Sequence, residues 1–494
     1  MTFENNYSDA ISKSSSETTS DCDSINKRPT TYERIQLIYS RDKDGIVSKR
    51  EFCDFDLDSF SSAVRESNKA VEIYNDFYVF KISSGIVWEY RKRNLWCGVV
   101  TEDFESTEFE SWFLYLVAKE SNVDYPKPGA IGSEIYAEVV AKIFAEELKN
   151  TVKDDKWETL GKQKFIKSAK FFTERWQPLE AVLPAFPCKS SNSEKVAGSL
   201  PDKGEELAIT KLIQFSETIK QLYPPGIIIW IVSDGHVFSD CIAVNDTVVN
   251  VYGQALKDLY NKIKPPMLDP IKFCSLPELF SLKAMNFEES LVEDVHLSHH
   301  LATELDKESE ICRKILVASC DTDSGKLHKD INTENHPRLH LFRGFSKFMT
   351  EDLINNPSVE KFSKKKFKKV VAKVAFEMIK RNDAYSNLVE LMFPFHLRFS
   401  IHSHNNSGPK FGIQLLSPVG PNKCQAIMAI EDHNIPRTDD LLHIPTPWHN
   451  CIVKIDNKET FFVVKSSKVE QAIEKGRGSG KWDDGKLHYV FMSN

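Results

Sequence analysis

The sequence predicts an α/β fold with a Rossmann-like, mostly parallel core sheet and helices on both faces. Segments with apolar residues at every third and fourth position, which is typical of amphipathic helices, alternate with short continuous apolar runs. A strand in a parallel sheet is buried on both faces, and a continuous apolar run suits that position. The alternation of helices with such strands is the pattern of the α/β class.

The first 125 residues are expected to lie outside this core. Residues 1–30 are rich in Ser, Thr and Asn and almost lack large apolar side chains, so we expect a disordered tail. Residues 31–125 are rich in aromatic side chains and are expected to form a small N-terminal accessory module. Residues 126–494 then form the predicted catalytic domain.

The core elements follow in order. Periodicity predicts helices over residues 131–150, 155–176 and 205–223, and buried strands over 179–187 and 227–232. The third helix ends at Pro224-Pro225-Gly226, which cannot continue a helix.

The C-terminal third is expected to contain antiparallel hairpins. Residues 397–404 and 410–416 flank Asn405-Asn406-Ser407-Gly408, and residues 451–455 and 460–464 flank Asp456-Asn457. Both intervening sequences are typical of hairpin turns. Residues 361–381 are predicted to form a helix whose many lysines make a solvated basic face, with contact to a membrane surface as the alternative. Polar residues 321–337 are expected to form a loop.

The composition narrows the class of protein. The chain has 494 residues, 41% of them hydrophobic, and a formal net charge of −7, which argues against a general nucleic-acid binder. Its longest apolar run, 226–232, is far shorter than the ~20 residues of a membrane span. Ten cysteines are scattered without a C-x-x-C pair, as expected for reduced thiols. With no secretory signal visible at the N-terminus, a cytoplasmic protein is expected.

A first candidate site follows the predicted strand 227–232. His236 lies between Asp234 and Asp240 in the sequence, directly after the strand, where open α/β sheets bind their ligands. A histidine between carboxylates suits proton transfer. The alternative is that Asp234 caps a turn and His236 packs in the core.

A second candidate is the segment 396–404. Alternation along a strand would place His396, Arg398, Ser400, His402 and His404 on one face. Such a face could bind an anion and move protons, or it could be a polar, solvent-facing strand. A metal-dependent oxygenase built on His402, His404 and a carboxylate is a rival interpretation, although no third ligand has diagnostic spacing.

Two further segments carry suitable side chains. Arg343 and Lys347 flank Gly344 and could hold a phosphate or carboxylate. Trp448 and His449 precede a predicted strand and could supply an aromatic wall and a titratable group.

Several of these segments together resemble the pyoverdine/dityrosine biosynthesis family, the isocyanide (isonitrile) synthases, over about residues 131–465. The resemblance rests on residues 183–192 (LPAFPCKSSN), 200–208 (LPDKGEELA), 223–226 (YPPG), 233–240 (SDGHVFSD), 342–349 (FRGFSKFM), 398–402 (RFSIH) and 446–449 (TPWH). Within the family, the chain most resembles the fungal branch, which includes members that begin dityrosine synthesis for the spore wall.

The resemblance implies a reaction without a redox cofactor or metal. The amino group of L-tyrosine would condense with the ketone of ribulose 5-phosphate, and cleavage of the sugar would leave one carbon on nitrogen as an isocyanide or N-formyl group. A cytochrome P450 would act downstream. Tryptophan or valine as substrate, or a non-catalytic binding protein of the same fold, remain the alternatives, because specificity depends on the shape of the site.

The demands of that reaction assign the candidate residues. Groups that transfer protons near neutral pH are needed, for which we select His236, His402 and His449, with Asp234 and Asp240 orienting His236 or holding the substrate ammonium. The cationic candidates for the phosphate are Arg343, Lys347, Arg398 and Lys410. Phe238 or Trp448 would line the aromatic ring, and Lys189 would bind the carboxylate.

Overall fold

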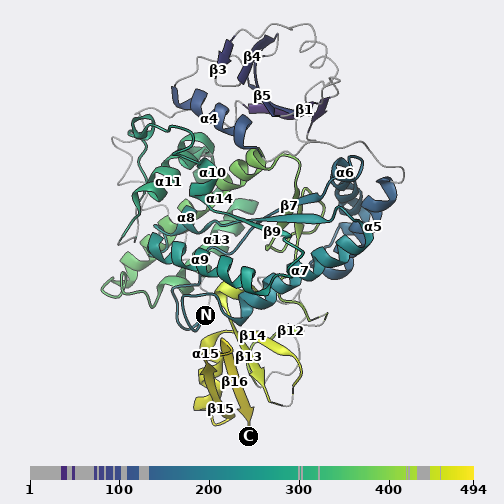
Figure 1. Ribbon diagram of the computed structural model, residues 1–494. Coiled ribbons are helices and arrows are strands. Elements are labelled where there is room, and N and C mark those ends of the chain that lie inside the picture. The colour runs from purple at the N-terminus through teal and green to yellow at the C-terminus, as the bar shows by residue number, and fades with distance from the viewer. Residues whose placement is uncertain are drawn as a thin grey trace.

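The described residues form three β-sheets, with a central parallel sheet between two outer ones (Figure 1). The structure is a computed structural model that describes residues 35–41, 47–49, 72–74, 77–82, 85–92, 95–101, 108–121, 133–298, 301, 304–320, 323–418, 420, 423–430, 445–456 and 458–494. The predicted tail, residues 1–30, and the predicted domain boundary at 125/126 lie outside these residues.

The central sheet has five parallel strands in the order β11-β10-β7-β8-β9. They are β7 (Leu179–Pro184), β8 (Ile227–Val232), β9 (Ile271–Cys274), β10 (Leu397–Ser400) and β11 (Lys410–Gly412). Strands β7, β8 and β9 lie side by side in sequence order, whereas β10 lies on the other side of β7. Strand order therefore reverses at the gap between β7 and β10.

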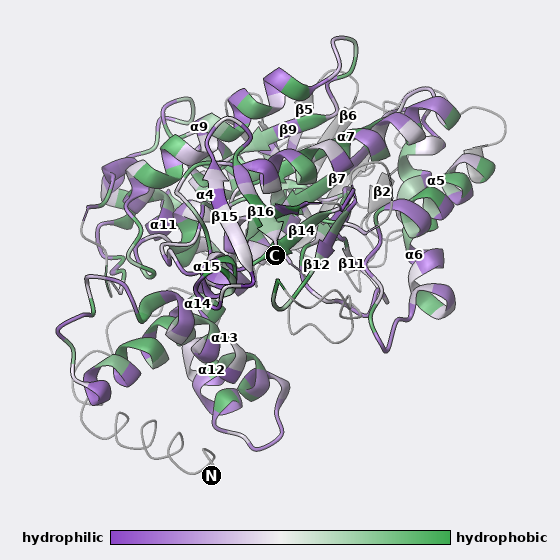
Figure 2. Ribbon diagram, turned by 90° about the horizontal axis from the view of Figure 1, so that it is seen from below, coloured by the Kyte–Doolittle hydropathy of each residue, from purple (hydrophilic) through white to green (hydrophobic). Residues whose placement is uncertain are grey.

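Helices cover both faces of this sheet, as predicted. One face packs against α5 (Ser133–Glu147), α6 (Lys162–Thr173), α7 (Lys203–Leu222) and α9 (Asp246–Ile263). The other packs against α4 (Glu108–Glu120), α8 (Gly235–Phe238), α10 (Leu276–Phe280), α11 (Lys307–Cys320), α13 (Pro337–Leu353) and α14 (Lys364–Met392). Hydrophobic and hydrophilic residues alternate along surrounding helices such as α5 (Figure 2), as expected for helices with one buried face.

An antiparallel sheet precedes the core and a mixed sheet follows it. The first has the order β2-β1-β6-β5-β4-β3; its strands are β1 (Ile35–Arg41), β2 (Val47–Lys49), β3 (Glu72–Tyr74), β4 (Phe77–Ile82), β5 (Gly85–Lys92) and β6 (Leu95–Thr101). The last has the order β12-β14-β13-β16-β15; its strands are β12 (Cys424–Ala426), β13 (Cys451–Ile455), β14 (Phe461–Val464), β15 (Gly478–Asp483) and β16 (His488–Ser493), and α15 (Ser466–Glu474) packs on it.

One of the two predicted hairpins is confirmed and the other is wrong. Strands β13 and β14 are antiparallel across the Asp456 turn. Strands β10 and β11 are parallel, with Phe399 opposite Phe411. The Asn406 side chain accepts from Gly412 N and donates to Asn150 O, which turns the connection back toward the start of β10. A turn sequence alone does not reveal such a return.

The predicted loop at 321–337 is also wrong, because residues Ser324–Ile331 form helix α12. Asp323 caps it by accepting from the backbone N–H groups of Gly325 and Lys326. Leu327 and Ile331, one turn apart, are buried against α13 and α14. The apolar stripe of this short helix has only two residues, so the polar composition concealed it.

Candidate functional site

The candidate active site lies at the carboxyl ends of the central strands. In open parallel sheets, ligands bind where the strand order reverses, because the loops on either side diverge there. Here that position is between the loop after β7 and the segment after β10. Asp234, after β8, lies one strand away.

Arg398 on β10, Lys410 at the start of β11 and His404 in the segment between them form a cation cluster. Arg398 on β10 pairs in register with Lys410 on β11 and with Val182 on β7, so the side chains point to the face that α14 covers. Lys410 Nζ donates to Ser386 Oγ of α14 at 2.7 Å. His404 Nε2 lies 3.0 Å from Ser400 Oγ at the end of β10.

The crowding of positive charge lowers the pKa values of two members of the cluster, His404 and Lys410. Burial, and then the charges of Lys410 and Arg398, lower the pKa of His404 to about 4. Burial and the neighbouring guanidinium of Arg398 likewise lower the pKa of Lys410. Each group is thus destabilised in its charged form, and an anion bound among the three would relieve that cost.

Asp234 is the acidic residue of the candidate site, opposite in charge to the cation cluster. Its Oδ1 is buried without a hydrogen-bond partner among the described residues. Burial raises the pKa of Asp234 to about 6. The hydroxyl of Tyr385 donates to Val232 O at 2.9 Å, and the charges of both Asp234 and Arg398 act on it. The hydroxyl of Tyr385 is therefore held at the end of β8, within reach of both charges.

His236 is not held by Asp234 and Asp240, contrary to prediction. Its Nε2 lies 2.8 Å from Asn250 Oδ1 of α9, and burial lowers the pKa of the ring. Its Nδ1 is buried without a hydrogen-bond partner among the described residues. The imidazole is therefore neutral near pH 7 and is positioned by an amide.

Asp240 is part of a buried ion pair and not of the candidate site. Both of its carboxylate oxygens accept from the guanidinium of Arg381 on α14, at 2.5 and 2.9 Å. Arg381 also donates to Glu377 and to Val237 O. Since the carboxylate is engaged by a bidentate cation, the expected catalytic role of Asp240 is corrected to a structural one.

Lys189 is likewise engaged, and the expectation that it binds the substrate carboxylate is corrected. Its Nζ lies 2.7 Å from Asp202, 2.8 Å from Glu205 and 2.9 Å from Pro447 O, which uses all three ammonium hydrogens. Burial alone would lower the pKa of Lys189, but the two carboxylates raise it. Lys189 thus joins the loop after β7 to the turn that carries His449.

The two predicted aromatic walls are buried. Trp448 is 2% exposed and packs against Phe186, with ring centroids 5.0 Å apart. Phe238 packs in the core between α11 and α14. Both rings are therefore part of the packing beneath the loops of the candidate site.

The remaining predicted residues are spread more widely. Strand β10 ends at Ser400, so the expected alternation of side chains does not extend to His402 and His404. His402 is exposed, whereas the ring of His404 contacts Ser400 at the end of the strand. Arg343 and Lys347 are exposed one turn apart on α13. His396 precedes the first residue of β10, and its Nε2 lies 2.7 Å from Glu180 Oε2.

A second polar cluster was not predicted. Lys195 Nζ lies 2.8 Å from Asp352 Oδ1, and Lys465 Nζ donates to His449 O. The ring of His449 stands edge-on to Phe348 of α13, with centroids 4.9 Å apart. Lys195 follows the first matched motif by three residues, and that proximity is the only signal for it in the sequence.

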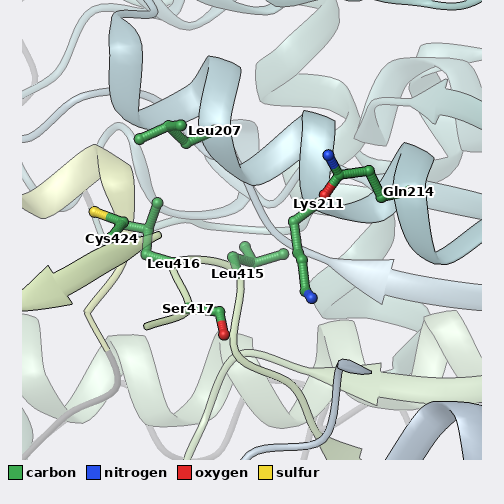
Figure 3. A pocket seen from close by; sticks show the side chains of 7 residues that line it. All are labelled: Leu207, Lys211, Gln214, Leu415, Leu416, Ser417 and Cys424. Atoms are coloured by element: carbon green, nitrogen blue, oxygen red, sulfur yellow. The ribbon is translucent and has the colours of Figure 1, made fainter. Parts of the chain in front are cut away.

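Other features of the surface do not compete with this site. Figure 3 shows a small hollow between α7 and the segment after β11, which contains none of the predicted residues; it is lined by Leu207, Lys211, Gln214, Leu415, Leu416, Ser417 and Cys424. Within the described residues, no three His, Cys, Asp or Glu side chains are grouped as a metal site. No helix in the same part of the chain is long and apolar enough to cross a membrane.

Comparison with known proteins supplies the family. A sequence model described as pyoverdine/dityrosine biosynthesis protein matches residues 169–476, which include both polar clusters. The chain belongs to the pyoverdine/dityrosine biosynthesis family.

Named relatives include several isonitrile synthases. The chain is 49% identical over 391 residues to the spore wall maturation protein DIT1 of Saccharomyces cerevisiae, covering 78% of this chain and 72% of that protein. It is 30% identical over 299 residues to an L-tyrosine isonitrile synthase of Xenorhabdus nematophila, covering 60% and 74%. It is 29% identical over 305 residues to the L-tryptophan isonitrile synthase AmbI2 of Fischerella ambigua, covering 62% and 76%.

A solved structure confirms the fold. The crystal structure of PvcA from Pseudomonas aeruginosa matches with a TM-score of 0.56 and 24% sequence identity, over 72% of this chain and 99% of that one. At this identity the similarity establishes the α/β architecture alone.

Proposed function

We propose that the protein converts the amino group of L-tyrosine to an isocyanide or N-formyl group, with ribulose 5-phosphate as the one-carbon donor and without a metal or redox cofactor. In this proposal it catalyses the first step of dityrosine synthesis for a fungal spore wall, in the cytoplasm, and a cytochrome P450 acts on its product. The relationship to a spore wall maturation protein and to tyrosine isonitrile synthases supports it.

The observation that carries the proposal is the cation cluster together with a carboxylate, Asp234, whose Oδ1 has no hydrogen-bond partner among the described residues. A sugar phosphate is a dianion at neutral pH, and Arg398, Lys410 and a protonatable His404 are the groups that bind one. An amino acid brings an ammonium group, and Asp234 Oδ1 is a buried carboxylate oxygen without a hydrogen-bond partner among the described residues. The two substrates would meet near Tyr385, on which both charges act.

Asp234 is also the best candidate for proton transfer. The amine must lose a proton before it attacks the C2 ketone of the sugar, and water must leave to form the imine. A carboxyl group with a pKa of about 6 accepts and returns a proton near neutral pH. His449, His402 and His236 remain candidates for later proton transfers.

The amino-acid substrate has a second candidate. One relative is named as an L-tryptophan isonitrile synthase, and its sequence identity to this chain, 29%, is nearly the same as the 30% of an L-tyrosine isonitrile synthase. Tryptophan and valine therefore belong in the same experiment.

The test is to incubate the purified protein with tyrosine and ribulose 5-phosphate labelled with ¹³C at C2, and to analyse the products by mass spectrometry. A tyrosine isocyanide or formamide that carries the label, formed equally with a chelator present, is the expected result. Heat-treated protein and unlabelled sugar are the controls.

Other outcomes would contradict specific parts of the proposal. A labelled product from tryptophan alone would replace the substrate. Loss of the product with chelator, and its recovery with iron, would favour the metal-dependent rival. A folded protein that forms no product from any of the three amino acids would overturn the proposed activity.

A further inference from the structure

Lys465 is a largely buried cation whose charge is incompletely balanced. It follows β14 directly and occupies the N-cap position of α15. Its Nζ donates to His449 O, and no carboxylate of the described residues forms an ion pair with it within 4.0 Å. An ammonium group has three hydrogens, so one carbonyl leaves it able to bind another acceptor.

Lys195 is a buried cation next to Lys465, since the backbone N–H of Ser466 donates to Lys195 O at 3.3 Å. Its Nζ lies 2.8 Å from Asp352 and 3.8 Å from Glu351, whose side chain is 52% exposed. The ammonium also lies over the ring of Phe348, at 4.6 Å from the centroid. Asp352 is thus a well-buried carboxylate that pairs with Lys195 and whose charge also acts on Lys465.

The positive charge of Lys195 also acts on Lys465. Burial, followed by the charge of Lys195, lowers the pKa of Lys465 to about 8, and Asp352 and Glu351 only partly oppose this. Burying a cation without a counterion is costly, and a bound anion would remove that cost. The cluster therefore has the electrostatics of an anion site.

The position of the cluster selects the anion. The loop after β7 connects the two regions, since Ser233 Oγ donates to Phe186 O at 3.2 Å and Ser190 Oγ donates to Asp352 Oδ1 at 2.9 Å. The lysines therefore adjoin the Asp234 side of the site, whereas Arg398 and Lys410 lie on strands β10 and β11, on the other side of β7. An α-amino acid carries its carboxylate next to its ammonium group. An ammonium at Asp234 would bring the carboxylate toward the lysines, whereas the nearby Asp352 would repel a dianionic phosphate more strongly than a singly charged carboxylate.

We propose that Lys195 and Lys465 form the subsite that binds the α-carboxylate of the amino-acid substrate. The inference rests on the proposed function and adds to it the orientation of the substrate: carboxylate toward α15, ammonium at Asp234, and sugar phosphate at the cation cluster. It also gives the C-terminal sheet a role, since β14 and the turn before β13 position Lys465 and His449.

The experiment measures binding by calorimetry, so that it does not depend on turnover. Tyrosine is compared with tyramine, which lacks only the carboxylate, and tryptophan and valine are compared with their decarboxylated amines. The wild-type protein is expected to bind one amino acid about 10- to 100-fold more tightly than its amine, as for a hydrogen-bonded charge pair.

Variants assign that preference to the lysine. Lys465→Met should reduce the preference to below about 3-fold, while affinity for the amine and for ribulose 5-phosphate stays the same. Lys465→Arg should restore part of it. Lys475→Met, at the exposed far end of α15, is the matched control and should behave as wild type.

Each contrary result has a separate meaning. Equal binding of acid and amine by the wild-type protein would overturn the subsite and leave the proposed reaction standing; this comparison needs no variant to fold. Equal loss of both ligands in Lys465→Met would show a structural role instead. A wild-type protein that binds no amino acid would overturn the proposed function and the subsite together.

Discussion

Arg398 and Lys410 occupy paired positions on the neighbouring parallel strands β10 and β11. Two cations in register on one face of a sheet repel one another, and burial strengthens the repulsion because less water screens it. Lys410 is held in this arrangement by Ser386 of α14. The pair therefore lowers the stability of the fold and at the same time creates a positive potential that attracts an anion. The first prediction concerns both effects.

Lys410→Met should stabilise the protein and weaken binding of the sugar phosphate. The pKa of Lys410 is lowered in the folded state, so its charge opposes folding at all pH values below the unfolded pKa of about 10.4. Removing it should add up to about 1 kcal/mol to the free energy of unfolding at pH 7. The affinity for ribulose 5-phosphate should fall about 10-fold, as expected for one charged hydrogen bond.

The matched control is Lys272→Met on the same face of the sheet, in β9. Lys272 pairs with the exposed Asp269, so this variant should lose at most about 0.5 kcal/mol and bind the sugar phosphate normally. Urea unfolding and calorimetry measure both properties. A destabilised Lys410→Met with unchanged affinity would refute the assignment of the cluster.

Asp234→Asn should be more stable than the wild-type protein above pH 6 and inactive. Burial raises the pKa of Asp234 from 3.8 to about 6, so the folded protein binds the proton more tightly than the unfolded chain. The carboxyl therefore lowers stability progressively as pH rises from about 4 to 6, and the loss is constant above that window. Two pKa units correspond to at most about 3 kcal/mol.

Urea unfolding of both proteins at pH 4 and at pH 8 checks this. The difference in unfolding free energy should be near zero at pH 4 and should favour the variant at pH 8. A variant less stable at pH 8 would mean that the carboxylate has a structural partner.

Asp240→Asn should act through folding and not through chemistry. It leaves the buried guanidinium of Arg381 without its bidentate partner, and breaking such a pair costs about 3–5 kcal/mol. The double variant Asp240→Leu/Arg381→Met removes both charges of this pair and should recover part of that stability, because Glu377 then lacks its cation. Thermal unfolding, with turnover measured on the folded fraction, distinguishes the two roles. A double variant that is as stable as the wild type and yet inactive would restore the catalytic assignment.

Binding of the sugar phosphate should be accompanied by proton uptake at pH 5 to 6. The pKa of His404 is lowered to about 4 by burial and by the charges of Lys410 and Arg398. A bound dianion would offset those charges and raise the pKa toward its usual value near 6.5, so the ring would take up a proton in that window.

Calorimetric titrations in buffers with different ionisation enthalpies measure the number of protons. His404→Gln should abolish the uptake without changing the fold. Uptake that persists in this variant would assign the proton to another group, such as Asp234.

The sequence by itself determined the local elements of the core and the family. Strand β8 has the predicted bounds, and α7 and β7 lie within two or three residues of theirs, because periodicity and the Pro224-Pro225-Gly226 stop act over a few residues. The family resemblance was equally local, and the match over residues 169–476 confirms it. Helix α12 and the direction of β11 were missed since each depends on a distant surface or contact.

Only the tertiary structure decided which polar residues remain available to a ligand. Asp234, Asp240, Lys189 and Arg398 are equally plausible in the sequence, as all are charged and lie in matched motifs. Arg381 from α14 engages Asp240, and Asp202 and Glu205 from the start of α7 engage Lys189. Asp234 Oδ1 is left without a partner among the described residues. A charge is available only if no opposite charge reaches it, and the partners lie 13 to 141 residues away along the chain.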